Sequence, residues 1–269
     1  MAAKTVDLGT EYLRLEHEGH LARCTIQRPR KRNALTVGMY FGIRRAVNYV
    51  NAQSEATALV LTGVDDVFAP GGEMTGHHPD TTPHDYDLLQ EIGNEWLPFE
   101  AIRNSRAPVV SAVNGICQGG GLLIAMLADV SVVSERATFR APELLRGVAD
   151  TGYAAYLPPH VGVARARDML LTARTVGARE AVEMGLVSRV VPHERLLEEA
   201  DAAAEAVLLT APDARMQLKR ILNANYGKVD LMTFNASLDG PEVREGFAAF
   251  GEKRTPAWVP KSLATGKRL

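Results

Sequence analysis

The chain has 269 residues, of which 46% are hydrophobic and 23% charged, and its formal net charge at pH 7 is -2. This composition is typical of a soluble globular protein with a large core. It lacks the excess of basic residues expected of a protein that binds nucleic acid. Cys24 and Cys117 lie far apart without metal-ligand spacing, so we expect a reducing compartment, the cytoplasm. No segment approaches the roughly 18 apolar residues of a membrane span, and we expect neither a membrane partner nor a targeting element.

The first third of the chain predicts a hairpin, a helix and a strand. Apolar and polar residues alternate on both sides of Glu18-Gly19-His20, as in two antiparallel strands around a tight turn. Thr36 is a candidate cap for a helix with apolar residues at three- and four-residue steps, namely Met39, Ile43, Val47 and Val50. The segment "ATALVLTG" predicts a buried strand that ends at Gly63, and the residues from there to His84 predict a long loop.

The middle of the chain alternates between helix and strand patterns. Residues 85–104 have helical periodicity, "PVVSAVNG" predicts a strand, "GGGLLIAMLAD" a helix and "VSVVSE" another strand. This alternation indicates an α/β core, and a repeated strand-strand-helix unit fits it. From Arg179 onward the chain is mainly helical, with "SRVVP" as the last expected strand and about 60 final residues as a helical extension.

Two loops offer small residues between an expected strand and an expected helix. They are "FAPGGEM" at residues 68–74 and "NGICQGGGLL" at residues 114–123. Glycine permits close approach, and free N–H groups at a helix start favour negative charge. Two such donors on one carbonyl oxygen would form an oxyanion hole, worth about 2.7 to 4 kcal/mol per donor. Either loop alone is also explained by a tight turn, and neither has the spacing of a dinucleotide or P-loop motif.

Six segments, in order over about residues 12–258, resemble the enoyl-CoA hydratase/isomerase (crotonase) superfamily: "RPRKRNAL", "FAPGGEM", "APVVSAVNGICQGGGLLIAMLADVSVVSERATF", "APELLRG", "AREAVEMGLVSRVVP" and "EGFAAFGEKRTP". The resemblance implies an α/β fold, a crotonase-like spiral of repeated strand-strand-helix units with a C-terminal helical trimerisation region. Residues 1–205 would form the acyl-CoA-binding spiral core and residues 206–269 the helical oligomerisation region. Homotrimers, or hexamers built as a dimer of trimers, are the expected assemblies.

The same resemblance implies an acyl-CoA thioester substrate, with coenzyme A as part of the substrate, no permanently bound cofactor and no metal. The backbone N–H groups of Gly72 and Gly120 would stabilise the enolate oxygen, where charge develops when a proton moves beside a thioester. The residues expected to contact CoA or substrate are Arg28, Arg30, Lys31, Arg32, Ala34, Ala69, Gly71, Met74, Leu123, Pro142, Phe250 and Lys253. For the basic residues the alternative is a solvated turn, and for Phe250 and Lys253 it is helix packing and surface charge.

The sequence departs from a typical hydratase of this family at one of its two glutamate positions. The first is Leu123, which can neither hold a water nor carry a proton, whereas the second, Glu143, is retained. Asp150 is either the cap of the next helix or a second proton carrier beside Glu143. In the second case, burial would raise the pKa of at least one of these two carboxyl groups toward the working range. We therefore expect a lyase or isomerase of fatty acid metabolism that transfers protons, without assuming hydration.

Two other functions remain open at this stage. One is hydrolysis of a carbon-carbon or thioester bond in an acyl-CoA or β-dicarbonyl substrate, and the other is acyl-CoA binding without catalysis, which Leu123 suggests. The segment "GHHPDTTPHDYD" contains His77, His78 and His84, but its spacing fits no standard metal signature, so we expect a polar lid there. Glu73 is expected to support the first glycine loop.

Overall fold

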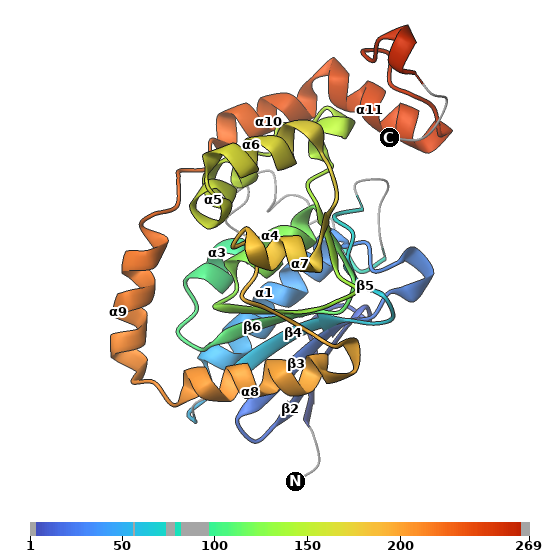
Figure 1. Cartoon of the computed structure of the whole chain (residues 1–269). Coiled ribbons are helices and arrows are strands. Elements are labelled where there is room, and N and C mark those ends of the chain that lie inside the picture. The colour runs from blue at the N-terminus through green and yellow to red at the C-terminus, as the bar shows by residue number, and fades with distance from the viewer. Residues whose placement is uncertain (1–3, 56, 74–78, 82–96, 265–269) are drawn as a thin grey trace. The chain divides into compact units, whose positions relative to one another are not determined.

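The computed structural model describes residues 4–55, 57–73, 79–81 and 97–264 (Figure 1). The chain forms two compact units, one of Met1–Arg140 with Thr175–Tyr226 and the other of Ala141–Arg174 with Gly227–Leu269. The division expected at residue 206 therefore falls inside the first unit. Residues 141–174, expected in the spiral core, belong to the same unit as the C-terminal helices.

The first unit contains a seven-stranded sheet in the order β1-β2-β3-β4-β6-β8-β11. The expected hairpin is confirmed, with Leu13 opposite Ile26 at its open end, and β3, β4, β6, β8 and β11 run parallel. The central strands are almost continuously buried, as expected for parallel strands covered on both faces. The strand bounds are Lys4–Val6 (β1), Leu13–Glu18 (β2), Leu21–Ile26 (β3), Ala58–Gly63 (β4), Val109–Val113 (β6), Val130–Ser134 (β8) and Arg189–Val191 (β11).

A second sheet in the same unit is built from shorter strands, in the order β10-β9-β7-β5. The strands are Val67–Ala69 (β5), Ile116–Gln118 (β7), Thr138–Arg140 (β9) and Val176–Gly177 (β10). Strands β5, β7 and β9 follow β4, β6 and β8 along the chain, which produces the expected repeat of paired strands. The expectation of an uninterrupted loop after Gly63 was wrong, because β5 lies within it.

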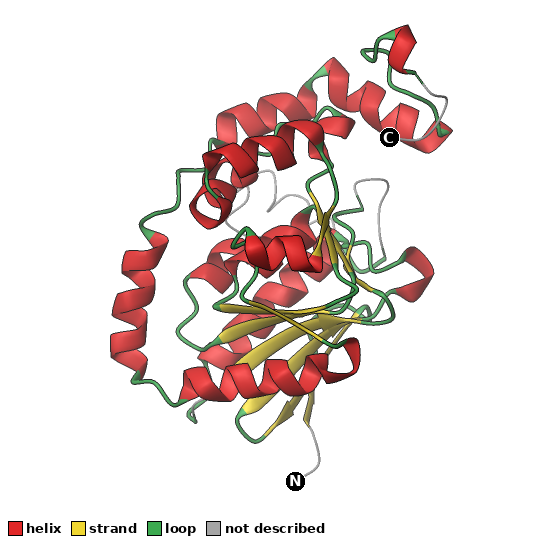
Figure 2. Cartoon of the chain, in the orientation of Figure 1, coloured by secondary structure: helices red, strands yellow, loops and turns green. Residues whose placement is uncertain are grey.

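Helices α1 and α8 pack against the large sheet of the first unit (Figure 2). Thr36 caps α1 (Val37–Asn51) as expected, since its Oγ1 accepts a hydrogen bond of 3.1 Å from the Met39 amide. The apolar face predicted for this helix is buried. Alanines of α8 (Leu196–Leu208) pack on Val60, Val110 and Val132, so this helix covers the β4, β6 and β8 face. The other helices of the unit are α3 (Pro98–Arg103), α4 (Gly120–Leu127), α7 (Ala178–Glu183) and α9 (Pro212–Asn223).

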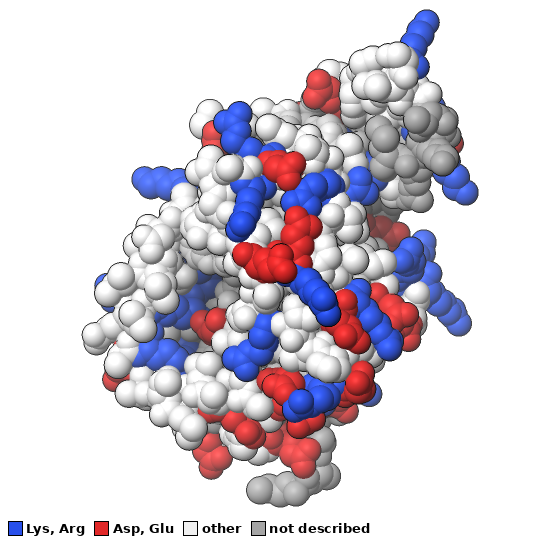
Figure 3. All heavy atoms as spheres, in the orientation of Figure 1, with Lys and Arg blue, Asp and Glu red and all other residues white. Residues whose placement is uncertain are grey.

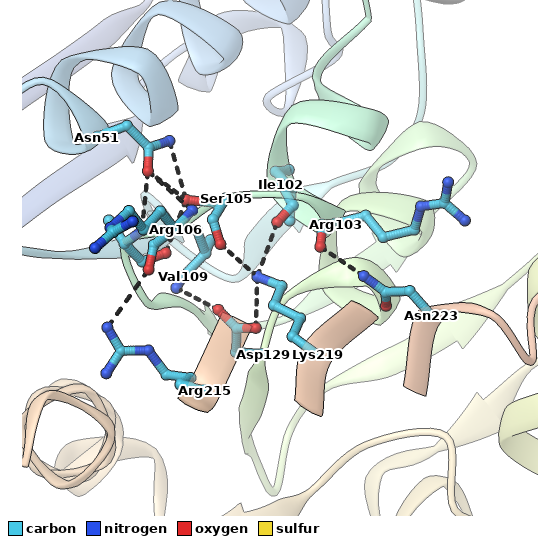
Figure 4. Close-up of polar contacts among 11 residues, drawn as sticks. Asn51, Ile102, Arg103, Ser105, Arg106, Val109, Asp129, Arg215, Lys219 and Asn223 are labelled. Carbon is cyan, nitrogen blue, oxygen red and sulfur yellow. Dashed lines mark hydrogen bonds and ion pairs between the residues drawn. The ribbon is translucent and has the colours of Figure 1, made fainter. Parts of the chain in front are cut away.

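Helix α9 is attached to the first unit by polar contacts rather than by a buried face (Figure 4). The Lys219 ammonium donates to the carbonyl oxygens of Ile102 and Ser105, at 3.3 and 3.0 Å, and lies 2.6 Å from Asp129 Oδ1. One turn further, Asn223 Nδ2 donates to the Arg103 carbonyl at 2.8 Å. These contacts attach α9 to the end of α3 and to the residues that begin β6 and β8.

The second unit is helical. It contains α5 (Thr151–Val161), α6 (Val163–Thr172), α10 (Leu231–Asp239) and α11 (Pro241–Glu252), together with the short 3-10 turn η3 (Glu143–Arg146). Turn η3 lies directly against α11: a side chain at Gly147 would meet the Glu242 backbone, and one at Gly246 would meet the Arg146 backbone. Two glycines thus allow the backbone that carries Glu143 to contact α11.

Charged side chains of both signs lie interspersed on the face drawn in Figure 3, where the described Lys and Arg residues alternate with Asp and Glu. The small net charge of -2 agrees with this mixture. Within the described residues, we find no helix with the length and apolar character needed to cross a membrane.

Candidate active site

The two glycine loops meet in the first unit. Strands β5 and β7 are parallel neighbours, so the loops that follow them begin at the same edge of the small sheet. A Cβ placed on Gly71 would lie 3.5 Å from the Gly119 Cα, which is van der Waals range. Gly71 and Gly119 have φ angles of 111° and 55°, a region that favours glycine. Glycine at these two positions therefore lets the backbones of the two loops come into contact.

In the first loop, the Gly72 N–H points away from Leu35, the residue that pairs with this loop. Leu35 N donates to Gly71 O at 2.9 Å, and Glu73 N donates to Leu35 O at 2.7 Å, which forms a parallel bridge across Gly72. Because successive amides of extended backbone alternate in direction, the Gly72 N–H faces the opposite side. Gly72 is exposed, and its N–H donates to no acceptor among the residues that the structure describes.

The second loop places Gly120 at the first position of α4. Leu122 N and Leu123 N both donate to Gly119 O, at 2.9 and 3.3 Å. The first N–H groups of a helix have no intrahelical acceptor, and the Gly120 N–H has none in the described part of the chain. The remainder of α4 is apolar and buried, and the positive end of its dipole lies at Gly120. Two backbone donors on adjoining loops are the arrangement that an oxyanion-binding site needs.

A buried ion pair supports the first loop, as expected for Glu73. The Arg28 guanidinium pairs with the Glu73 carboxylate, donates to the Ala34 carbonyl at 3.0 Å and lies 5.0 Å above the Tyr12 ring. Arg28 is only 8% exposed. The Arg28 charge is therefore directed at Glu73 inside the protein, and its expected contact with a CoA phosphate stays a prediction.

The other basic residues of this segment are on the surface. Arg30 and Arg32 are exposed, and the exposed Lys31 ammonium lies 3.6 Å from Glu73 Oε1. Their positions in and beside the 3-10 turn Pro29–Lys31 leave their charged groups in solvent. Spacing alone could not separate these three residues from Arg28, because the partner of Arg28 is 45 residues away.

The small and apolar candidates form the walls of these loops. Ala69 is fully buried at the end of β5, and its carbonyl oxygen would be 2.5 Å from a Cβ on Gly121. Ala34 is half-buried, and Leu123, one turn after Gly120, is 3% exposed. Met74 and the histidines His77, His78 and His84 lie outside the described residues.

The two candidate carboxylates belong to the second unit. Glu143 follows Pro142 and begins η3; its side chain is half-buried and its Oε2 atom is buried. Asp150 does cap α5, because its Oδ1 accepts a 2.9 Å hydrogen bond from the Gly152 amide. Burial raises the pKa of the Asp150 carboxyl above its ordinary value, although hydrogen bonds from backbone amides oppose the shift. Asp150 therefore caps α5 and also has a raised pKa, so the two roles expected for it are compatible.

The C-terminal candidates lie on and after α11. The Phe250 ring lies under the Arg146 guanidinium, with Cζ 3.9 Å from the ring centroid. Lys253 follows the helix at a φ of 58° and is exposed. The Phe250 ring thus packs against Arg146, and the Lys253 charge is in solvent.

Sequence reasoning missed Tyr40, on α1. Its hydroxyl oxygen is the atom nearest to the position that a Cβ on Gly120 would occupy. The two residues are eighty positions apart, and helical spacing placed Tyr40 outside the apolar stripe of α1, so the sequence carried no signal of this contact.

Comparison with known proteins identifies the family and agrees with the paired-strand spiral. A family model described as Enoyl-CoA hydratase/isomerase matches residues 16–261. A probable mitochondrial enoyl-CoA hydratase of Dictyostelium discoideum is 32% identical over 256 residues, which cover 91% of this chain and 90% of that protein. A mevalonyl-coenzyme A hydratase of Aspergillus fumigatus is 30% identical over 257 residues, covering 91% and 93% of the two chains.

Solved structures show the same architecture. An enoyl-CoA hydratase/isomerase from Pseudoalteromonas atlantica superposes with a TM-score of 0.77 at 29% identity, over 93% of this chain and 100% of that one. The family model matches most of the residues, and the solved structure extends over both units. The chain therefore has the crotonase fold and belongs to the enoyl-CoA hydratase/isomerase family of enzymes that act on acyl-CoA thioesters.

Proposed function

We propose that the protein moves protons on an acyl-CoA, with the Gly72 and Gly120 N–H groups binding the thioester oxygen. One observation carries this proposal: two adjoining glycine loops present backbone N–H groups that no described residue accepts. Removing a proton beside the thioester carbonyl places negative charge on that oxygen. Fixed donors stabilise the charge where it develops, by about 2.7 to 4 kcal/mol per donor.

Glu143 is the proposed proton carrier, and Asp150 is its proposed partner. A carboxyl group whose pKa is raised by burial exchanges protons more readily at working pH than an ordinary aspartate does, and Asp150 has such a shift. Leu123 cannot take a proton, so two-glutamate hydration lacks a participant. We therefore favour isomerase-like transfer, in which one carbon loses a proton and another gains one.

Coenzyme A binding is proposed to use the exposed charges of Arg30, Lys31 and Arg32 for its phosphates. Arg28 supports these residues indirectly through Glu73. The remaining contacts proposed for the CoA and acyl portions come from Ala34, Ala69, Gly71, Met74, Leu123, Pro142, Phe250 and Lys253. A homotrimer, or a hexamer made of two trimers, is the proposed assembly, and the exposed apolar residues Leu218, Ile221 and Leu222 of α9 support it.

A panel of enoyl-, dienoyl- and β-oxoacyl-CoA esters tests the function. Gly72→Pro deletes the proposed donor but leaves both hydrogen bonds to Leu35, which use Gly71 O and Glu73 N. We expect it to lower kcat by about 10²- to 10³-fold, whereas Gly72→Ala, which keeps the N–H, should retain far more activity. Glu143→Gln should abolish most turnover.

Turnover that survives both Gly72→Pro and Glu143→Gln would refute this mechanism. Release of a carboxylic acid or a free thiol would identify a hydrolase instead. Tight acyl-CoA binding without any chemical change across the panel would identify a binding protein.

A further inference from the structure

The tip of the Tyr40 side chain occupies the space beside the Gly120 Cα. If residue 120 had a Cβ, the Tyr40 Oη would be its nearest neighbour, with the ring atoms Cζ and Cε1 at 2.8 and 3.0 Å. Atoms at these separations overlap, so Tyr40 in its present position requires glycine at residue 120. The phenol hydroxyl therefore lies next to one of the two proposed oxyanion donors.

The position of Tyr40 is fixed by the packing of α1 and α3. Its ring meets the Phe99 ring edge to face, with centroids 6.0 Å apart and an interplanar angle of 68°. Met39 and Phe41, on either side of it in α1, are buried in the core. Tyr40 itself is half-buried.

One short segment of chain contacts both glycine loops. Leu35 forms the bridge that holds Gly72, and Tyr40, five residues later, contacts Gly120. The Thr36 cap between them fixes the start of α1 relative to Leu35. The segment from Leu35 to Tyr40 thus connects the two backbone donors physically.

The first turn of α4 has no polar side chain of its own, since its residues are Gly120, Gly121, Leu122 and Leu123. A polar side-chain group at this helix start must come from another element, and the Tyr40 hydroxyl is such a group. A phenol hydroxyl has one O–H group that can donate a hydrogen bond.

We propose that the Tyr40 hydroxyl is a third hydrogen-bond donor at the proposed oxyanion site, where it acts on the same substrate oxygen as the Gly120 N–H. This inference rests on the function proposed above. A donor aimed at developing charge lowers the barrier more than it improves substrate binding. Removing it should therefore reduce kcat and leave KM nearly unchanged.

The test compares Tyr40→Phe with two matched variants. Tyr40→Phe keeps the ring and its contact with Phe99 but removes the hydroxyl, whereas Tyr40→Ala removes both. Tyr49→Phe, on the same helix, removes a hydroxyl that contacts His17 Nδ1 at 2.9 Å, away from Gly120. We expect Tyr40→Phe to lower kcat by about 10²-fold with KM changed less than about threefold, and Tyr49→Phe to leave both unchanged.

A spectroscopic probe separates this inference from the proposed function. The probe is 4-dimethylaminocinnamoyl-CoA, whose absorption moves to longer wavelength when its thioester carbonyl is polarised. We expect a red shift on binding to the wild-type protein and a smaller shift with Tyr40→Phe. A wild-type kcat and full red shift in Tyr40→Phe, while Gly72→Pro loses both, would overturn the role of Tyr40 alone. Absence of turnover and of any red shift in the wild-type protein would overturn both proposals.

Discussion

The Lys219 ammonium lies 2.6 Å from Asp129 Oδ1, and the two side chains expose only 11% and 17% of their surface. Asp129 Oδ2 also accepts a 2.8 Å hydrogen bond from the Val109 amide, at the first residue of β6. Because α9 has no buried side chain, this ion pair is a main attachment of the helix to the sheet. Figure 4 shows the ammonium among its three oxygen partners.

Lys219→Met should therefore destabilise the protein. It leaves the mostly buried Asp129 carboxylate without its cation, which costs about 3 kcal/mol in comparable buried pairs. Urea unfolding measures the loss, and hydrogen exchange should show faster exchange across α9. Arg220→Met is the matched control, because Arg220 is exposed on the same helix. Adding Asp129→Asn to Lys219→Met should recover part of the stability; equal stability of the Lys219 and Arg220 variants would contradict the prediction.

Arg28 and Arg30 should behave differently although they are two residues apart. Arg28→Met removes the guanidinium from the Glu73 carboxylate, so it should lower stability by about 3 kcal/mol and lower kcat by disturbing the Gly72 loop. Arg30→Met removes an exposed charge, so it should raise KM for acyl-CoA without changing stability. Thermal unfolding and steady-state kinetics on both variants check this. A higher KM with unchanged stability in Arg28→Met would contradict this prediction and support the phosphate contact expected of Arg28.

The ionised Asp150 carboxylate should lower the free energy of unfolding at neutral pH. Its folded-state pKa is raised by burial, so the folded protein binds the proton more tightly than the unfolded chain does. The free energy of unfolding therefore falls as pH rises above the ordinary aspartate pKa of 3.8, and the loss persists at neutral pH. Asp150→Asn keeps an oxygen to cap α5 and cannot ionise. It should be more stable than the wild-type protein at pH 7 and equal to it at the lowest pH, while its kcat falls by about 10²-fold.

Asp230 is a control for Asp150, because its pKa is shifted in the opposite direction and its charge should therefore stabilise the folded protein. It caps α10 by accepting from the Thr233 amide and hydroxyl, at 3.0 and 2.7 Å, and these bonds lower its pKa. Its contribution to stability is present above the ordinary aspartate pKa and is lost as pH falls through the folded-state value. Asp230→Asn should thus lose stability at pH 7 relative to the wild-type protein. Urea unfolding at several pH values measures both variants, and a common sign for the two would show that the burial of Asp150 has been misread.

Local spacing predicted the parts of the fold that local forces determine. The buried stripe of α1, its Thr36 cap and the β2–β3 hairpin each depend on residues a few positions apart. The strands β7, β9 and β10 have two or three residues, too few to show a period, and their pairing partners are distant in sequence. The glycine motifs pointed to the two loops that meet in the structure for a similar reason, since each glycine serves a local turn.

The contacts that define roles within the site join distant residues, so spacing could not reveal them. Arg28 resembles its basic neighbours until Glu73 is placed beside it. Tyr40 is an ordinary helical residue until α4 brings Gly120 against its hydroxyl. For the same reason spacing gave no sign that residues 141–174 share a unit with segments that follow them by more than fifty residues.

Helix α9 should be part of the interface between subunits. Leu218, Ile221 and Leu222 expose 59%, 67% and 59% of their surface, which is unusual for three apolar residues within two turns. Ile221→Glu should shift the protein from trimer or hexamer toward monomer in light scattering after size exclusion. Gln217→Glu, at an exposed polar position of α9, is the control. An unchanged molar mass in Ile221→Glu would exclude this face from the interface.

Gly120→Ala should destabilise the protein through Tyr40. The added methyl group would overlap the Tyr40 hydroxyl and contact Cζ and Cε1 at 2.8 and 3.0 Å, and overpacking of this kind costs about 1 to 3 kcal/mol. In a Tyr40→Ala background the obstruction is gone, so the same substitution should cost much less, a coupling of about 1 to 2 kcal/mol. Gly251→Ala is the control: its Cβ would meet nothing within 4 Å inside α11, so alanine should be neutral or slightly stabilising. Additive losses in Gly120→Ala and Tyr40→Ala would mean that the phenol moves aside at little cost and does not hold a fixed place at the start of α4.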